Sequence, residues 1–263
     1  MVKLNQIIEA MEKMAPLYLK EDFDNVGLMV GDKNESVKRV LLALDCTLEV
    51  IEEAKKLKAD LIITHHPLIF SRPKSITTDT LQGKKIIELI RNNINLYSSH
   101  TNLDSVEGGL NQTIVEMLGF KSNEILEKSK ITSHKNAGLG RIIRLEEEMD
   151  LTDLINNIKS NLNINTLRVV DGKKKVKNIA VINGSGQSFL KQAVDEGADC
   201  IITGDTTYHF ALDYKEMGVT IIDTGHFSSE WLVFLKTMEG IKEEFKEIEF
   251  IASTKVEDPY KFI

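Results

Sequence analysis

The chain has 263 residues, of which 42% are hydrophobic and 28% charged, and its formal net charge is −7. This composition is typical of a globular protein, and the acidic balance disfavours non-specific nucleic-acid binding, which depends on basic surface. No run of about 18 apolar residues is present, so we expect no membrane contact. The chain has two cysteines, Cys46 and Cys200, which lie far apart in the sequence. A disulfide framework is therefore not indicated, and the reducing cytoplasm is favoured.

The first part of the chain predicts a helix followed by a strand–helix–strand unit. Residues 1–14, MVKLNQIIEAMEKM, have an amphipathic helical pattern with internal charges, unlike a signal peptide. From Arg39, an apolar run, a polar turn, a helix with apolar residues at about 3.6 spacing and a second apolar run follow one another. A third predicted strand ends in NINLYSSHTNLD.

The middle, roughly residues 121–177, is more polar. GLGRIIRL predicts a strand, and DLTDLINNIKSNL predicts a helix that Asp150 or Thr152 opens as N-cap. KKKVK, at 173–177, is best read as a charged, solvated turn. A second series of strands and helices begins at Asn178 and ends near VTIIDTGHFSSE.

The second series repeats the first. Residues 39–66 align without a gap on residues 178–205, so that Ala59-Asp60 meets Ala198-Asp199. Two short α/β segments could match by chance, because Ile, Val and Ala are common. We predict the α/β class, with two similar βαβ-containing halves (1–125 and 126–263) and largely parallel or mixed sheets. We expect the halves to pack together around a metal site.

Ionisable residues collect where the predicted strands end. Ligands of open parallel sheets bind at the carboxyl ends of the strands, and five of the six histidines occur there. Imidazole and carboxylate suit two divalent ions of zinc, iron, manganese or nickel. The alternative is that such histidines are satisfied polar groups without a ligand. The candidate metal ligands are His65, His66, Asp104, His226 and Glu230.

The adjacent pair His65-His66 indicates two ions rather than one. Neighbouring side chains of an extended segment point to opposite sides, and Pro67 restricts His66 to extended geometry. Each imidazole could therefore hold a different ion of a close pair. His226 and Glu230 have i, i+4 spacing. In a helix this spacing would let both side chains face the same point.

Two weaker signals concern substrate contact. The GSG at 184–186 could place backbone N–H groups near a phosphate, although a plain tight turn explains it as well. Arg72 and Lys74, just past the paired histidines, are the best candidates for gripping a phosphate.

Six motifs occur in series along the chain: DNVGL at 24–28, THHPL at 64–68, SHTNLD at 99–104, GSG at 184–186, TGD at 203–205 and GHFSSE at 225–230. Together they resemble the GTP cyclohydrolase 1 type 2 / NIF-three-like family over nearly the whole chain. The resemblance implies a dinuclear site in which His66, Asp104 and Glu230 hold one ion, and His65, His226 and the bridging Glu230 hold the other. It also implies a ring-shaped homohexamer, a trimer of dimers, and a short form without the central domain of longer relatives.

These observations support two main functions. The first is a metal-dependent hydrolase in which a metal-activated water attacks a purine nucleotide or similar heterocycle, with His100 and His209 as catalytic proton carriers. His209 and Tyr208 could instead support the metal ligands. The second is a non-enzymatic metal-binding or metal-trafficking scaffold with a protein partner. A third idea, nucleic acid threaded through a ring, conflicts with the acidic charge.

Overall fold

The structure, a computed structural model, describes residues 1–121, 124–131 and 133–261. The chain forms two compact units. Unit 1 comprises Met1–Val106 and Thr237–Glu257, and unit 2 comprises Glu107–Lys236 and Asp258–Ile263. The predicted halves, 1–125 and 126–263, have a single boundary, whereas residues 237–257 return to unit 1.

Unit 1 is built on a five-stranded sheet in the order β13-β4-β5-β6-β2. Its neighbouring strands are parallel except for β2, which pairs antiparallel with β6. A separate pair, β1 and β3, is antiparallel. The strands are β1 (Val2–Lys3), β2 (Gly27–Val30), β3 (Ser36–Val37), β4 (Arg39–Ala43), β5 (Leu61–Thr64), β6 (Asn95–Ser98) and β13 (Glu249–Ala252). The helices are α1 (Leu4–Met14), α2 (Leu48–Leu57), α3 (Leu81–Arg91), α4 (Thr101–Ser105) and α10 (Glu239–Glu244), with a 3₁₀ turn η1 (Leu17–Leu19).

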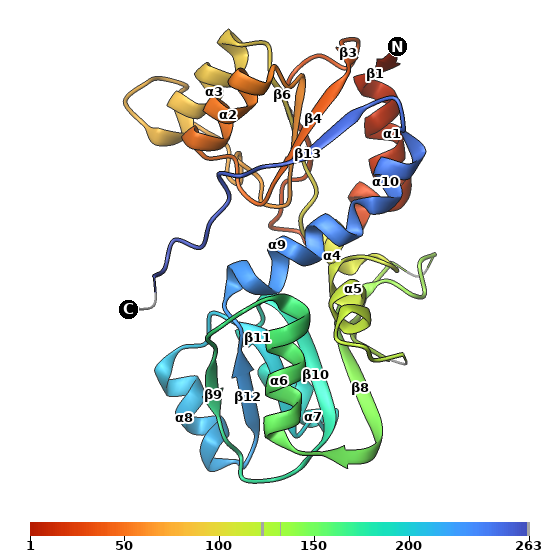
Figure 1. Cartoon of the computed structure of the whole chain (residues 1–263), viewed down its shortest axis with the longest axis vertical. Coiled ribbons are helices and arrows are strands. Elements are labelled where there is room, and N and C mark those ends of the chain that lie inside the picture. The colour runs from red at the N-terminus through yellow and green to blue at the C-terminus, as the bar shows by residue number, and fades with distance from the viewer. Residues whose placement is uncertain (122–123, 132, 262–263) are drawn as a thin grey trace. The chain divides into compact units, whose positions relative to one another are not determined.

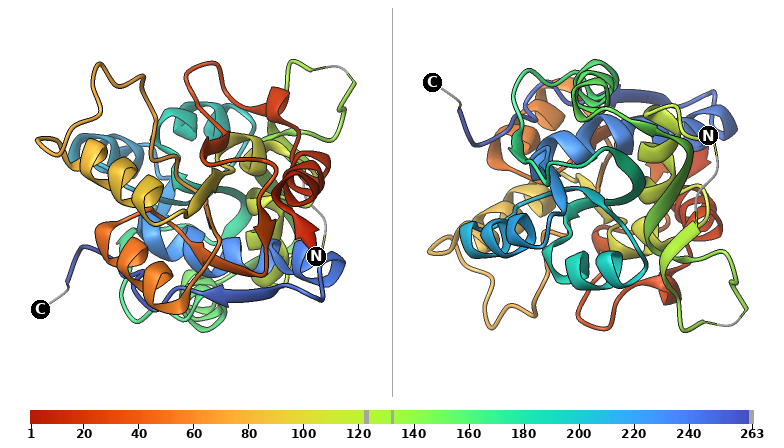
Figure 2. Two further views of the ribbon diagram at one scale, coloured as in Figure 1. Left: turned by 90° about the horizontal axis from the view of Figure 1, so that it is seen from above. Right: turned by 90° about the horizontal axis from the view of Figure 1, so that it is seen from below.

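Helices cover both faces of the unit 1 sheet, which explains its continuous apolar strands. Helices α2 and α3 lie on one face, and α1 and α10 on the other (Figure 1). The view from above agrees for α1, α2 and α3 (Figure 2). On the α2 side the buried core includes Leu41, Ile51, Ala54, Ile62 and Leu89.

Unit 2 is built on a six-stranded mixed sheet in the order β7-β8-β10-β11-β12-β9. The central strands β10, β11 and β12 are parallel, and the others are antiparallel to their neighbours. The strands are β7 (Glu124–Lys128), β8 (Gly138–Met149), β9 (Arg168–Val170), β10 (Val176–Ser185), β11 (Cys200–Gly204) and β12 (Thr220–Asp223). The helices are α5 (Leu110–Met117), α6 (Leu151–Leu162), α7 (Leu190–Asp195), α8 (Tyr208–Glu216) and α9 (His226–Thr237), with a 3₁₀ turn η2 (Gln187–Phe189).

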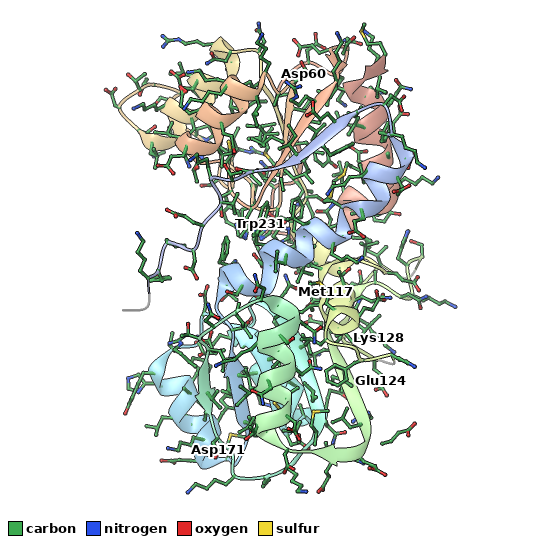
Figure 3. The ribbon with its side chains drawn as sticks, in the orientation of Figure 1. Asp60, Met117, Glu124, Lys128, Asp171 and Trp231 are labelled. Atoms are coloured by element: carbon green, nitrogen blue, oxygen red, sulfur yellow. The ribbon has the colours of Figure 1, made fainter. Side chains whose placement is uncertain are left out.

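The polar middle of the chain therefore supplies antiparallel strands to unit 2. Glu124 and Lys128 lie at the two ends of β7, which pairs with β8 (Figure 3). Helix α6 follows Asp150, one of the two predicted N-caps. Helices α7 and α8 share a core with the sheet through Leu190, Ala193 and Tyr214.

The predicted internal repeat is visible in matching strand registers. Val40 pairs with Leu61 in unit 1, and Ile179 pairs with Cys200 in unit 2, as the gapless alignment requires. Asp60, labelled in Figure 3, lies where β4 begins and accepts backbone N–H groups of Lys38 and Arg39. Asp199 accepts those of Lys177 and Asn178 in the same way. The α/β class with two similar βαβ-containing parts is confirmed.

None of the helices within the described ranges combines the length and the apolar character needed to cross a bilayer.

Candidate metal centre

His65 and His66 follow β5 at the carboxyl end of the unit 1 sheet. The Thr64 hydroxyl donates to the His66 carbonyl at 2.8 Å, and the His66 N–H donates to Leu44 at 3.0 Å. The two ring centroids lie 5.1 Å apart, with a 44° angle between the planes. This is closer than the opposite-facing arrangement that we expected. Because β5 ends at Thr64, the alternation of a regular strand does not extend to these residues.

His100 and Asp104 join the same group from α4. His100 is the N-cap residue, and its carbonyl accepts the Asp104 N–H at 3.0 Å. The His100 ring lies 5.1 Å from that of His65 and 5.5 Å from that of His66. One ring nitrogen from each of the three histidines lies within 4.8 Å of the others. Asp104 Oδ1 lies 3.7 Å from His65 Nε2, so the predicted convergence of strand ends is confirmed in unit 1.

Hydrogen bonds at Nδ1 orient the paired imidazoles. His65 Nδ1 lies 2.9 Å from the Ser99 carbonyl, and His66 Nδ1 lies 2.9 Å from Asp45 Oδ1. A carbonyl only accepts, so His65 carries its proton on Nδ1 and presents the Nε2 lone pair. A donation from Nδ1 to an oxygen is the usual partner of a metal bond at Nε2, because it fixes the tautomer and the ring orientation.

His100 has the same arrangement with a buried carboxylate. Its Nδ1 lies 3.0 Å from Asp24 Oδ1, and Asp24 also accepts the backbone N–H and the hydroxyl of Thr101. Burial raises the pKa of Asp24, but the hydrogen bonds from His100 and Thr101 outweigh it and hold that pKa well below its ordinary value. Asp24 is therefore ionised at neutral pH and accepts hydrogen bonds with both carboxylate oxygens.

His226 and Glu230 form the corresponding group in unit 2. Helix α9 begins at His226, and His226 Nε2 lies 3.1 Å from Glu230 Oε2, which confirms the predicted i, i+4 contact. Asp205, after β11, lies 2.7 Å from His226 Nδ1. Glu230 is 3% exposed, and its Oε1 accepts from Asn183 Nδ2 at 3.2 Å. An anionic group buried this deeply needs compensating charge.

Gly184, the first residue of the GSG motif, lies against this pair near the end of β10. Gly184 has φ +58°, and its N–H donates to Ser229 Oγ at 2.9 Å. A Cβ at residue 184 would lie 2.2 Å from Glu230 Oε1 and 3.3 Å from His226 Nε2. The sequence left a phosphate loop and a plain turn open. In the structure Gly184 and Ser185 are the last residues of β10, whose pairing with β11 is irregular between Val181 and Ser185, and Gly184 leaves room for a carboxylate.

The donors of both groups fit divalent metal ions. They are imidazole nitrogens and carboxylate oxygens, several of them buried, and their tautomers leave Nε2 as the ligand atom. Cys46 and Cys200 are buried and free. Burial raises the pKa of the Cys46 thiol to about 12 and that of Cys200 further still, so neither is a ready thiolate ligand.

Other candidate residues lie elsewhere. His209 is exposed on α8, where its ring contacts Tyr208 at 5.4 Å. Arg72 and Lys74 are exposed in unit 1. The predicted site residues did not include Asp24, Asp45 and Asp205, the carboxylates that lie within hydrogen-bond distance of histidine Nδ1 atoms. Asp45 and Asp205 follow β4 and β11 at the same edges as the histidines, a signal that could have identified them.

The fold and the site together define a class of protein. It is an α/β protein with a duplicated unit and with histidine–carboxylate groups at the ends of its strands. The chain belongs to the Duf34/NIF3 (NGG1p interacting factor 3) family, whose sequence profile matches residues 2–259. This confirms the family resemblance.

Individual relatives support the same family assignment. A Clostridium perfringens (strain 13 / Type A) protein named GTP cyclohydrolase 1 type 2 homolog is 56% identical over 264 residues, covering 100% of both chains. The crystal structure of a Bacillus cereus protein related to NIF3 superposes with a TM-score of 0.90 at 28% identity, covering 100% of this chain and 99% of that one. A Staphylococcus aureus (strain MRSA252) homolog of the same name as the clostridial one is 30% identical over 370 aligned residues, covering 100% of both. That alignment exceeds the 263 residues of this chain, so the staphylococcal relative is longer.

Proposed function

We propose that this protein binds two divalent metal ions and uses them as a hydrolase. His66, Asp104 and Glu230 would hold one ion, and His65, His226 and Glu230 the other, with Glu230 as the bridge. The observation that carries the proposal is the shared Nδ1 arrangement of the histidines, each bonded to a carbonyl or carboxylate oxygen. Satisfied core histidines have no need of this common orientation.

The chemistry divides between the ions and the side chains. When bound, divalent ions lower the pKa of a coordinated water and polarise the group under attack. His100, held by Asp24 at 3.0 Å and close to His65 and His66, would carry a proton to or from the substrate. A contribution from His209 would require the substrate to reach the exposed face of α8.

The substrate class follows from the name of the relatives. The clostridial relative is named a GTP cyclohydrolase 1 type 2 homolog, so a purine nucleotide or a similar heterocycle is the first class to test. The reaction would be hydrolytic opening of an electron-poor ring.

Elemental analysis against protein concentration tests the metal proposal. We expect two ions per chain after loading and dialysis. His65→Ala and Glu230→Gln should each lower this ratio. His134→Ala and Glu124→Gln, outside both groups, serve as matched controls. A ratio of one in the unaltered protein would contradict the bridged pair.

Turnover is tested separately with a panel of nucleotides, phosphoesters and amides. We expect one class to be hydrolysed, with activity abolished in His65→Ala and Glu230→Gln and retained in both controls. Two bound ions with no turnover would instead favour a metal-binding or metal-trafficking scaffold that contacts a protein partner.

His100 can be assigned by a further comparison. If it carries protons, His100→Ala should keep both ions and lose turnover. If it is a ligand, the metal ratio should fall.

We also propose a homohexamer, a trimer of dimers, located in the cytoplasm. The family resemblance supports the assembly, and the free, buried cysteines suit a reducing compartment. Light scattering should give the mass of six 29.6 kDa chains. A monomer at micromolar concentration would contradict the assembly.

A further inference from the structure

A cavity of about 620 Å³ opens in unit 2 beside His226. It is lined by residues after β11 and β12, the start of β9, the first turn of α9 and residues 258–261. Its volume is in the range of cavities that hold small organic ligands. The charged and polar groups of its wall decide which ligand it would recognise.

Arg168 is the fixed cation of this wall. It lies directly across from Asp223 in the β9–β12 ladder. Its Nη2 donates to the Asp223 carboxylate and to the Thr206 carbonyl, the latter at 3.0 Å. The side chain is still 62% exposed. Within the described ranges Nε and Nη1 have no protein acceptor, so two of its donor atoms remain for a ligand.

The acidic groups of the wall are already used by the protein. Asp223 is 3% exposed and also accepts the N–H groups of Thr206 and Gly225, each at 2.9 Å. Asp258 accepts the backbone N–H of Tyr260 at 2.8 Å. Asp205, the third acid, holds His226. Asp223 and Asp205 are therefore engaged by donors of the protein, and Arg168 is a wall residue with donor atoms left for a ligand.

Two further features favour an anion. Lys261 lies on the wall and is exposed. The amino end of the 12-residue α9 also opens into the cavity through Gly225 and His226, and helix amino ends attract negative charge. Guanidinium groups bind phosphate oxygens through paired N–H donors.

The cavity is too large for a lone anion, and aromatic rings line it. Phe227 and the largely exposed Tyr260 both belong to the wall and could contact a planar ring. We propose that this cavity binds a phosphate-bearing ring compound, with Arg168 as the phosphate anchor. The proposal rests on the proposed function, since it places the substrate next to His226, a proposed metal ligand.

Equilibrium titration with guanosine and guanosine 5′-monophosphate tests this anchor, because the two probes differ by one phosphate. Both are titrated into metal-loaded and chelator-stripped protein. We expect the monophosphate to bind roughly tenfold tighter or more in both forms. Arg168→Ala should abolish this preference, and Arg168→Lys should restore part of it. Arg144→Ala, which removes an arginine paired with Glu124 in the same unit, is the matched control and should keep the preference.

Four outcomes would overturn the proposal. They are equal or absent binding of the two probes, a preference that survives Arg168→Ala, a preference seen only with metal, and loss of metal from Arg168→Ala. A preference seen only with metal would mean that the phosphate binds the metal ions. Loss of metal from Arg168→Ala would mean that Arg168 positions His226 rather than the phosphate. Failure of hydrolysis would not affect this comparison, because the stripped protein gives its own binding result.

Discussion

Substitution of Gly184 by alanine is the sharpest test of the His226–Glu230 group in unit 2. The new Cβ would lie 2.2 Å from Glu230 Oε1, whereas carbon–oxygen contacts are ordinarily about 3.3–3.6 Å. Gly184 lies in β10, and its N–H is held by Ser229 Oγ, so the Glu230 side chain is the part that must move. The required shift is about 1 Å or more. It would carry the carboxylate away from His226 Nε2.

The expected consequence is a loss of metal affinity rather than a loss of fold. A displacement of about 1 Å in a precise site can cost roughly 100-fold, which corresponds to about 2.7 kcal/mol. Competition against a metal-binding dye would measure this change. Stability should fall only by the strain of a left-handed alanine, about 1–2 kcal/mol.

Gly197→Ala is the control for that strain. Gly197 also has positive φ, +88°, but a Cβ there meets no atom within 4 Å. Both variants should therefore lose similar stability, and only Gly184→Ala should lose metal affinity. Equal metal affinities for the two would refute the reasoning that Gly184 makes room for a liganding carboxylate.

Three further predictions concern the remaining carboxylates and the metal. Asp205→Asn keeps a residue suited to φ +56° but weakens the hold on His226 Nδ1, so metal affinity should drop about 10–100-fold; an unchanged dissociation constant would argue against this role. Glu53 accepts hydrogen bonds from Ser253 and Thr254; burial raises its pKa, but these bonds outweigh burial and lower the pKa below its ordinary 4.5. Glu53→Gln should thus cost about 1–3 kcal/mol at pH 7, and this difference in denaturant unfolding should shrink as the pH falls below 4.5 and the wild-type carboxylate is protonated; a difference that did not vary with pH would exclude the mechanism. Zinc at about 100 times its dissociation constant should add about 2.7 kcal/mol to the free energy of unfolding, seen as a higher melting temperature that a chelator reverses; no shift would mean that the folded state binds zinc no better than the unfolded state.

The sequence predicted the repeat and the site edges because both depend on local patterns. Apolar runs ending in histidine identify a strand and its carboxyl end together. His100 and His226 each follow a strand at the same edge of their sheets, but they lie two and three residues after the equivalent ladder positions Ser98 and Asp223. Ser98 pairs with Thr64, and Asp223 with Thr203, so unit 2 inserts one more residue before its histidine.

What the sequence could not provide were contacts between distant segments. Asp24 reaches His100 across 76 residues, and Arg168 reaches Asp223 across 55. Such contacts depend on strand order, and the antiparallel strands added by the polar middle region set that order in unit 2. The orientation of His65 and His66 also depended on where β5 ends, which a pattern locates only approximately.

The route of the chain has a consequence for its synthesis. Residues 107–236 form nearly all of unit 2 without interruption, whereas unit 1 is closed by β13, whose residues 249–252 pair with β4. A growing chain can therefore complete the later unit's sheet while the earlier one still exposes the β4 edge to solvent. Until β13 emerges from the ribosome, that edge is the part of the nascent protein most open to mispairing.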